Sequence, residues 1–165
     1  MKDNLADFLV AVKSANLIKT DDNNYTSKFI ALNSDYNLFE LCSERYNDAN
    51  YVGGREVITY LFKADNFAPV IESLITNQNA KCLLNCVKIH DIGSWDHENF
   101  YYEDNCRVEV QTGIVECELK INELRLEYTT KFTPQGITLI KESEINRTLN
   151  KDTLKDMIKT AIKKI

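Results

Sequence analysis

The sequence predicts an α+β domain, in which a twisted antiparallel sheet carries N-terminal, central and C-terminal helices packed on one face. Apolar residues recur at three- and four-residue spacing near both ends and once mid-chain, which is typical of amphipathic helices. Alternating apolar and polar residues dominate the second half, which is typical of strands. Since 165 residues contain no linker or internal repeat, we expect a single domain over residues 1–165.

The first helix is predicted over Asp3–Leu17, where apolar residues recur at helical spacing after a polar start that can cap the first turn. Short strands are predicted at Lys28–Leu32, Leu38–Arg45 and Glu56–Phe62. The last of these is rich in β-branched and aromatic residues, which favour strands. A helix is the alternative for Leu38–Arg45.

The central helix is predicted from Asp65 or Asn66 to Thr76, and Pro69 is tolerated because it stands in the first turn. A last helix is predicted over Lys151–Ile165, where a continuous apolar stripe faces away from the lysines. We expect this helix to pack on its own sheet. A membrane surface and another protein chain are the alternatives.

The middle of the second half predicts three antiparallel strands. Lys81–Ile89 is a plausible strand, and apolar residues alternate with polar ones in Cys106–Val110 and Val115–Ile121. The polar and glycine residues of Gln111–Gly113 predict a turn between the last two of these strands.

The chain after this point predicts a break, a turn and one more strand. The apolar phase shifts at Asn122–Glu123, which indicates a bulge or a strand break. Thr133–Gly136 contains proline and glycine and predicts a turn before a final strand, Ile137–Ile145.

Charge and composition restrict the class of protein. The formal net charge of −5 and the pI near 5.1 argue against direct binding of nucleic acid. The apolar runs are far shorter than the roughly 20 residues that span a bilayer, and no signal peptide is recognisable. We therefore expect a cytoplasmic protein, in which an odd number of cysteines stays reduced. The five cysteines are Cys42, Cys82, Cys86, Cys106 and Cys117.

The cysteine spacing does not predict a metal site. Along a strand, Cys82 and Cys86 would lie roughly 13 Å apart, which is too far to share one ion. Cys106 and Cys117 occupy apolar positions of their strands, so core packing explains them better.

Catalytic motifs are missing from the sequence. It contains no Gly-rich phosphate loop, no dinucleotide fingerprint, no His-Glu-x-x-His and no nucleophile elbow, so we expect no cofactor and favour a protein that is not an enzyme. Both histidines stand beside carboxylates in the segment His90–Glu98, which is predicted to be a polar loop. Imidazole and carboxylate groups suit metal binding or proton transfer, although an ordinary solvated loop is the favoured interpretation. The weak metal-ligand candidates are His90, Asp96, His97 and Glu98.

An acidic stretch supplies the candidate binding surface. Between Asp91 and Glu118, eight acids stand against a single base, Arg107. Carboxylates on one face of the sheet, with aromatic residues beside them, would suit a basic partner. The alternative is the ordinary solvated face of an antiparallel sheet. The candidate partner-binding residues are Glu103, Asp104, Glu109, Glu116, Glu118, Tyr101, Tyr102 and Trp95.

These features favour a non-catalytic intracellular protein-binding domain, such as an inhibitor, an immunity factor or a chaperone-like adaptor, that binds a basic partner surface through an acidic sheet face. One alternative is a small-ligand or metal-dependent enzyme centred on His90–Glu98. Another is a structural subunit of a larger assembly with the terminal helices as contacts, and a homodimer is left open. The order of elements is similar in outline to small secretion-chaperone domains and to cavity-bearing folds of the nuclear-transport-factor type, which implies no function without a shared motif.

Overall fold

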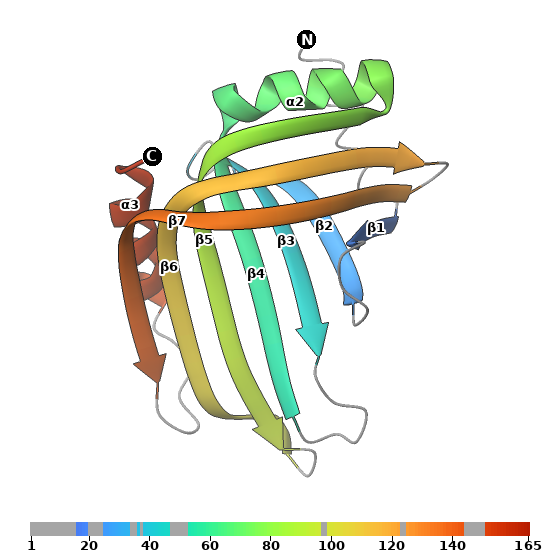
Figure 1. Ribbon diagram of the computed structural model, residues 1–165. Coiled ribbons are helices and arrows are strands. Elements are labelled where there is room, and N and C mark those ends of the chain that lie inside the picture. Colours follow the sequence, from blue (N-terminus) through green and yellow to red (C-terminus); the bar gives the residue numbers. More distant parts are fainter. Residues whose placement is uncertain are drawn as a thin grey trace.

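The computed structural model describes residues 16–19, 25–33, 36, 38–46, 53–96, 99–122, 125–143 and 151–165 (Figure 1). Side chains are described at residues 36, 38–42, 56–93, 107–121, 127–142 and 152–165. Within these ranges the chain forms one seven-stranded sheet and two helices.

The sheet is antiparallel apart from one pair of strands. Along the chain the elements are β1 (Asn16–Lys19), β2 (Tyr25–Asn33), β3 (Leu38–Tyr46), β4 (Gly53–Lys63), α2 (Ala64–Asn77), β5 (Asn79–Asp96), β6 (Asn99–Asn122), β7 (Arg125–Ser143) and α3 (Lys151–Ile162). In space the strands follow the order β1-β7-β6-β5-β4-β3-β2, and among the described strands only β1 and β7 are parallel. The edge strands β1 and β2 also contact each other, so the sheet is strongly curled.

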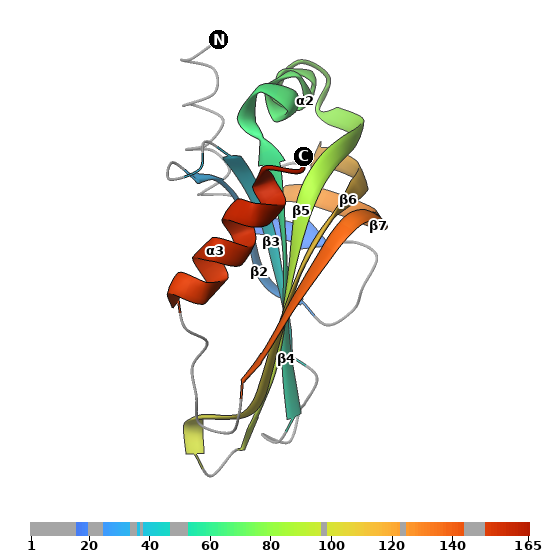
Figure 2. The same ribbon diagram turned by 90° about the vertical axis from the view of Figure 1, so that its left-hand side faces the viewer.

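The predicted α+β arrangement, with three helices on one face of the sheet, is wrong. The described chain is mainly antiparallel sheet, and its two helices contact opposite faces of it (Figure 2). Adjacent residues of β4 demonstrate this, because neighbours along a strand point to opposite faces. Phe62 packs in the cluster around α2, whereas Leu61 packs in the cluster around α3. We call the α2 side the inner face and the α3 side the outer face.

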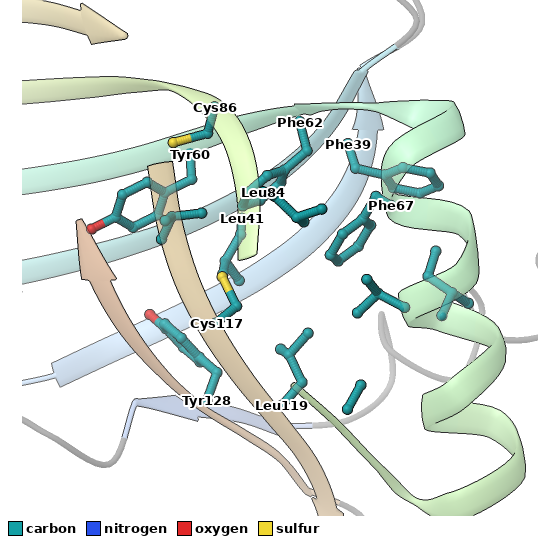
Figure 3. Close-up of a cluster of buried hydrophobic side chains, with 14 of the residues drawn as sticks. Phe39, Leu41, Tyr60, Phe62, Phe67, Leu84, Cys86, Cys117, Leu119 and Tyr128 are labelled. Atoms are coloured by element: carbon teal, nitrogen blue, oxygen red, sulfur yellow. The ribbon is translucent and has the colours of Figure 1, made fainter. Parts of the chain in front are cut away.

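The inner face is concave. Tyr60 lies on β4 and Phe132 on β7, three strand spacings away, which is about 14 Å in a flat sheet. Their ring centroids are nevertheless 6.2 Å apart. The sheet therefore curves around its inner face, and residues of β3, β4, β5, β6, β7 and α2 share one core there (Figure 3).

The long strands β5, β6 and β7 change which face is apolar halfway along their length. In β6, Val108 and Val110 are buried on the outer face beneath α3, whereas Val115 and Cys117 are buried on the inner face with α2. We call residues 87–96, 99–112 and 137–143 the α3 half, and residues 79–86, 113–122 and 125–134 the α2 half. The predicted turn at Gln111–Gly113 is wrong, because β6 runs through it. The apolar phase of β6 changes at these residues because the covered face changes there.

A bulge in β7 accompanies the bend of these strands, which is visible in Figure 1. Pro134 lies opposite Gly113, but Thr138 lies opposite Gln111, so β7 has extra residues here. The turn predicted at Thr133–Gly136 is therefore wrong, since proline and glycine stand in a bulge of a continuous strand. Gly136 has φ of 148°, which suits glycine.

The bulge is held by a hydrogen bond between strands. The backbone N–H of Ile137 donates to Oγ1 of Thr112 at 3.1 Å, so the hydroxyl replaces a partner that the interrupted ladder cannot supply. Thr112 itself is 3% exposed. Its hydroxyl is thus one of the few buried polar side-chain groups of the described core, and the bulge explains its presence.

Other predicted elements are confirmed. The strands at Lys28–Leu32, Leu38–Arg45 and Glu56–Phe62 lie within β2, β3 and β4, and the strand at Lys81–Ile89 is the first part of β5. The predicted break near Asn122 is also confirmed, because β6 ends there and β7 begins at Arg125.

The predictions for the helices have different outcomes. The central and C-terminal helices are confirmed as α2 and α3, although no side chain caps α2, whose N-cap is Lys63. The apolar stripe of α3 packs on its own sheet, with Ile158 and Ala161 buried against the outer face. The predicted helix Asp3–Leu17 lies outside the described residues up to residue 15, and its last two residues belong to β1.

Glu40 provides a test of the outer-face core. It stands on β3 opposite Leu61, and burial raises the pKa of its carboxyl above the usual 4.5. A raised folded-state pKa means that stability falls as the pH rises from 4.5 through the folded pKa. We expect Glu40→Gln to be more stable than wild type at pH 7, by a small margin that vanishes near pH 4. Urea unfolding at both pH values measures this margin, and Glu72→Gln on the exposed side of α2 is the control. An equal gain at both pH values would contradict this cause.

Candidate functional site

The inner face of the α3 half, together with the adjoining residues of β4, is the best candidate site, because α2 packs on the other half of that face. Strand registers place its residues in three rows across the sheet. The first row contains Glu56, Ile92, Arg107 and Glu142; the second contains Ile58, His90, Glu109 and Ile140; the third contains Lys88, Gln111 and Thr138. We call these eleven residues the open patch.

Two exposed isoleucines stand within the open patch. Ile92 on β5 is 38% exposed and Ile140 on β7 is 49% exposed. They lie on either side of β6, from which Arg107 and Glu109 project to the same face. Apolar side chains among charged ones, with an arginine between them, have the composition of protein interfaces.

Arg107 is only loosely paired with the carboxylates beside it in the open patch. Arg107 Nη2 lies 3.8 Å from Oε2 of Glu109, and Arg107 Nε lies 3.9 Å from Oε1 of Glu142. These distances exceed those of hydrogen bonds, and the side chains of Arg107 and Glu142 are 46% and 72% exposed. The arginine therefore lies near two carboxylates while its side chain stays partly exposed to solvent.

His90 forms the closest polar contact of the open patch. Its Nε2 lies 2.5 Å from Oε1 of Glu56 on the neighbouring strand β4, and both side chains are largely buried. Lys88 lies one row deeper, with its Nζ 5.0 Å from the centre of the Phe132 ring. The His90–Glu56 pair and Lys88 mark the boundary between the open patch and the inner core.

The segment His90–Glu98 is not the loop that the sequence predicted. His90 through Asp96 belongs to β5, because β4 and β6 both continue along it. The Asp96 side chain, His97 and Glu98 lie outside the described part. Within the described part no group of three His, Cys, Asp or Glu residues can hold a metal ion. The predicted cluster is therefore represented only by His90, whose partner Glu56 is distant in sequence.

The three glutamates predicted to share one acidic surface do not lie on one face. Glu109 faces inward with His90, whereas Glu116 and Glu118 face outward. The prediction failed because it placed a turn at residues 111–113, while the strand continues there and its alternation is unbroken. Each outward glutamate also lies opposite a lysine, Glu116 opposite Lys131 and Glu118 opposite Lys81. The outer face of the α2 half is thus locally neutralised.

The remaining partner-binding candidates lie in the distal part of the β5–β6 hairpin. Trp95 is on β5, with Glu103 opposite it on β6, and the neighbouring candidates continue along β6. Their side chains are not among those described, so their role stays a prediction. The neighbouring candidates are Tyr101, Tyr102 and Asp104.

Leu83 marks the strongest competing surface. It is 70% exposed on the outer face of the α2 half, between Lys81 and Asn85 along β5. Beside it, a pocket of about 160 Å³ is lined by residues of β5, β6 and β7, and a second pocket of about 220 Å³ lies between α2 and α3. Both volumes are below the roughly 300 Å³ at which ligand pockets usually begin. These surfaces suit a small molecule poorly.

Sequence reasoning missed Glu56, Ile92 and Ile140. Ile92 and Ile140 occupy positions of strand alternation that solvent-facing residues usually take, which was a readable signal. The pairing of Glu56 with His90 had no such signal, because it depends on the register between β4 and β5.

Comparisons with known proteins do not identify a family for this chain. Protein-family models, curated protein sequences and solved structures were each compared with the chain, and none matches it. Among the described residues, neither helix is long and apolar enough to span a membrane. A functional interpretation therefore depends on the surfaces described above.

Proposed function

We propose that the chain is a non-catalytic protein-binding domain and that the open patch is its binding surface. The observation that carries this proposal is the exposure of Ile92 and Ile140 on the inner face of the α3 half, since α2 packs on the other half of that face and α3 packs on the outer face. Full burial of an exposed isoleucine contributes about 1.5–3 kcal/mol, and because Ile92 and Ile140 are already partly buried, a partner that covers them would add roughly half of this or less for each.

The charges of the open patch define the partner that fits it. Three carboxylates stand against two bases, which leaves a small excess of negative charge when His90 is neutral. A partner with apolar side chains and a basic rim would complement this arrangement. An inhibitor, an immunity factor or a chaperone-like adaptor would each bind in this way, and partner identity distinguishes among them.

Paired substitutions on the two faces test the proposal. We expect Ile140→Asp and Ile92→Asp each to lower the amount of one specific protein captured from a native lysate by about tenfold, since an interface centre is sensitive to a buried charge. The control is Leu83→Asp, which places the same charge on an apolar residue of the outer face that is still more exposed than the two isoleucines. It should capture the partner as wild type does.

The opposite pattern would contradict the proposal. If Leu83→Asp lost the partner while Ile140→Asp kept it, the outer face would be the interface. Circular dichroism of each variant establishes that it is folded before capture is compared. Because all three residues are already exposed, we expect each substitution to leave the fold intact.

A second candidate function is an enzyme or small-ligand binder, and the His90–Glu56 contact favours it. A histidine held by a carboxylate within 2.5 Å is an arrangement that supports proton transfer. This function would be favoured if purification yielded a bound small molecule, seen by native mass spectrometry, that His90→Gln removes. The protein-binding function takes precedence because two exposed isoleucines share the open patch with this pair.

A further inference from the structure

Two cysteine thiols face each other inside the sheet. Cys82 on β5 and Cys117 on β6 are direct cross-strand partners, and the register is continuous from Asn79 opposite Lys120 to Gly93 opposite Cys106. Directly opposite residues of an antiparallel pair have Cα atoms about 4.5–5.5 Å apart. This separation lies within the roughly 4.4–6.8 Å that a disulfide requires, so a bond between the two sulfurs needs no shift of register.

The side chains are oriented for contact. Both belong to the inner-face core, and Sγ of Cys82 lies 3.7 Å from the carbonyl oxygen of Cys117. Cys117 is 1% exposed, whereas Cys82 is only partly buried. A dissolved oxidant therefore reaches the sulfur of Cys82 first, whereas the sulfur of Cys117 is shielded from solvent.

The pKa values of the two thiols also favour Cys82 as the group that reacts first. Hydrogen bonding to the Cys117 side chain lowers the pKa of the Cys82 thiol below its usual value of 9.0. The same hydrogen bond, together with burial, raises the pKa of Cys117. The thiolate is the reactive form of cysteine, so Cys82 is the better nucleophile and Cys117 retains its proton.

The third thiol on this face is poorly placed to compete. Cys86 is four residues from Cys82 along β5, roughly 13 Å away, and lies opposite Gly113. It is fully buried, and burial raises its pKa to about 12. Within the described residues no group of three potential ligands can hold a metal ion. The geometry therefore favours reaction between two thiols.

We propose that Cys82 and Cys117 form an oxidation site, in which hydrogen peroxide or another peroxide converts the facing thiols into a disulfide between β5 and β6. The Cys82 thiolate attacks one peroxide oxygen and the O–O bond breaks, which leaves Cys82 as a sulfenic acid and releases hydroxide that takes a proton to become water. Cys117 loses its proton and its sulfur attacks the Cys82 sulfur. The S–O bond breaks and a second water leaves. The two thiols together lose two electrons to the peroxide.

Peptide mapping of the full chain tests this site. The purified protein is treated with a small excess of hydrogen peroxide, its remaining thiols are alkylated, and it is digested with trypsin. Cleavage after Lys81, Lys88, Arg107 and Lys120 gives one peptide of residues 82–88 and another of residues 108–120. We expect these two peptides to be linked, with a loss of two hydrogens, and the link to disappear on reduction.

Variants assign the link to one sulfur of the first peptide, which contains both Cys82 and Cys86. The link should persist in Cys86→Ser and vanish in Cys82→Ser. In Cys117→Ser, Cys82 should stop at the sulfenic acid, which dimedone traps. Since Cys117 is buried and its variant can fail to fold, the partly exposed Cys82→Ser, checked by circular dichroism, is the decisive comparison.

Two results would overturn the proposal. One is a link that survives in Cys82→Ser and is lost in Cys86→Ser, which would assign the reactive thiol to Cys86. The other is wild-type protein in which Cys82 advances to sulfinic acid, or stays reduced, while Cys117 remains an alkylated free thiol.

Discussion

Phe62→Ala is expected to lower the free energy of unfolding by about 3–5 kcal/mol, the range for removal of a buried phenylalanine. Phe62 is fully buried, and its ring stacks on Phe67 of α2 with centroids 5.2 Å apart. The substitution would therefore remove the ring contact between β4 and α2 and leave a cavity beneath the helix. Because small domains have total stabilities of about 5–15 kcal/mol, this loss would leave a substantial unfolded fraction in a marginal case.

Urea unfolding followed by circular dichroism measures the effect of Phe62→Ala. The control is Ile140→Ala, which removes a large apolar side chain from an exposed position on the same face and should cost less than about 1 kcal/mol. Equal losses in the two variants would mean that α2 does not pack on the inner face as described.

Gly113→Ala is expected to lower the free energy of unfolding by about 1–3 kcal/mol, the range for overpacking of a close-packed site. A methyl group at residue 113 would lie 2.6 Å from two atoms of the Phe132 ring and closer still to the carbonyl oxygen of Thr133. The ring could turn aside, but the carbonyl belongs to the backbone of the facing strand. The bulge that joins the two halves of the sheet would therefore have to deform.

Thermal unfolding compares Gly113→Ala with Gln135→Ala, a substitution at an exposed position of the same bulge. Gln135→Ala should leave the midpoint nearly unchanged. If Gly113→Ala proved as stable as wild type, the close approach of β6 and β7 at this point would be contradicted.

Local sequence patterns predicted the central and C-terminal helices and most strand segments, because the periodicity of each element is visible within a short stretch of the chain. The apolar stripe of Lys151–Ile165 and the central helix before Thr76 needed no knowledge of distant contacts. The N-terminal helix is untested before Asn16, where β1 begins.

Local patterns did not predict which face of the sheet is buried at each point along a strand. A change of apolar phase at residues 111–113 has two local explanations, a turn or a strand that passes from one covered face to the other. With β6 continuous, the second explanation holds. Glu109 and Glu116 consequently lie on opposite faces, and the predicted acidic surface was lost with the predicted turn.

The register between strands also lies beyond the reach of local patterns. Pairing of β5 with β6 shifts at Trp95 near the hairpin tip, and this irregularity decides that Cys82 faces Cys117. The contact of His90 with Glu56 depends likewise on the register of β4. Sequence reasoning singled out His90 as a weak metal-ligand candidate, but its carboxylate partner comes from a strand more than thirty residues earlier.

Titration of the captured, purified partner onto three forms of the chain tests whether the open patch is the binding surface. The forms are wild type, Ile140→Asp and Leu83→Asp, and isothermal calorimetry gives each affinity. We expect Ile140→Asp to weaken binding by about tenfold or more, equivalent to about 1.4 kcal/mol, while Leu83→Asp stays within about twofold of wild type. Unchanged affinity for Ile140→Asp, together with a loss for Leu83→Asp, would contradict the assignment and place the interface on the outer face.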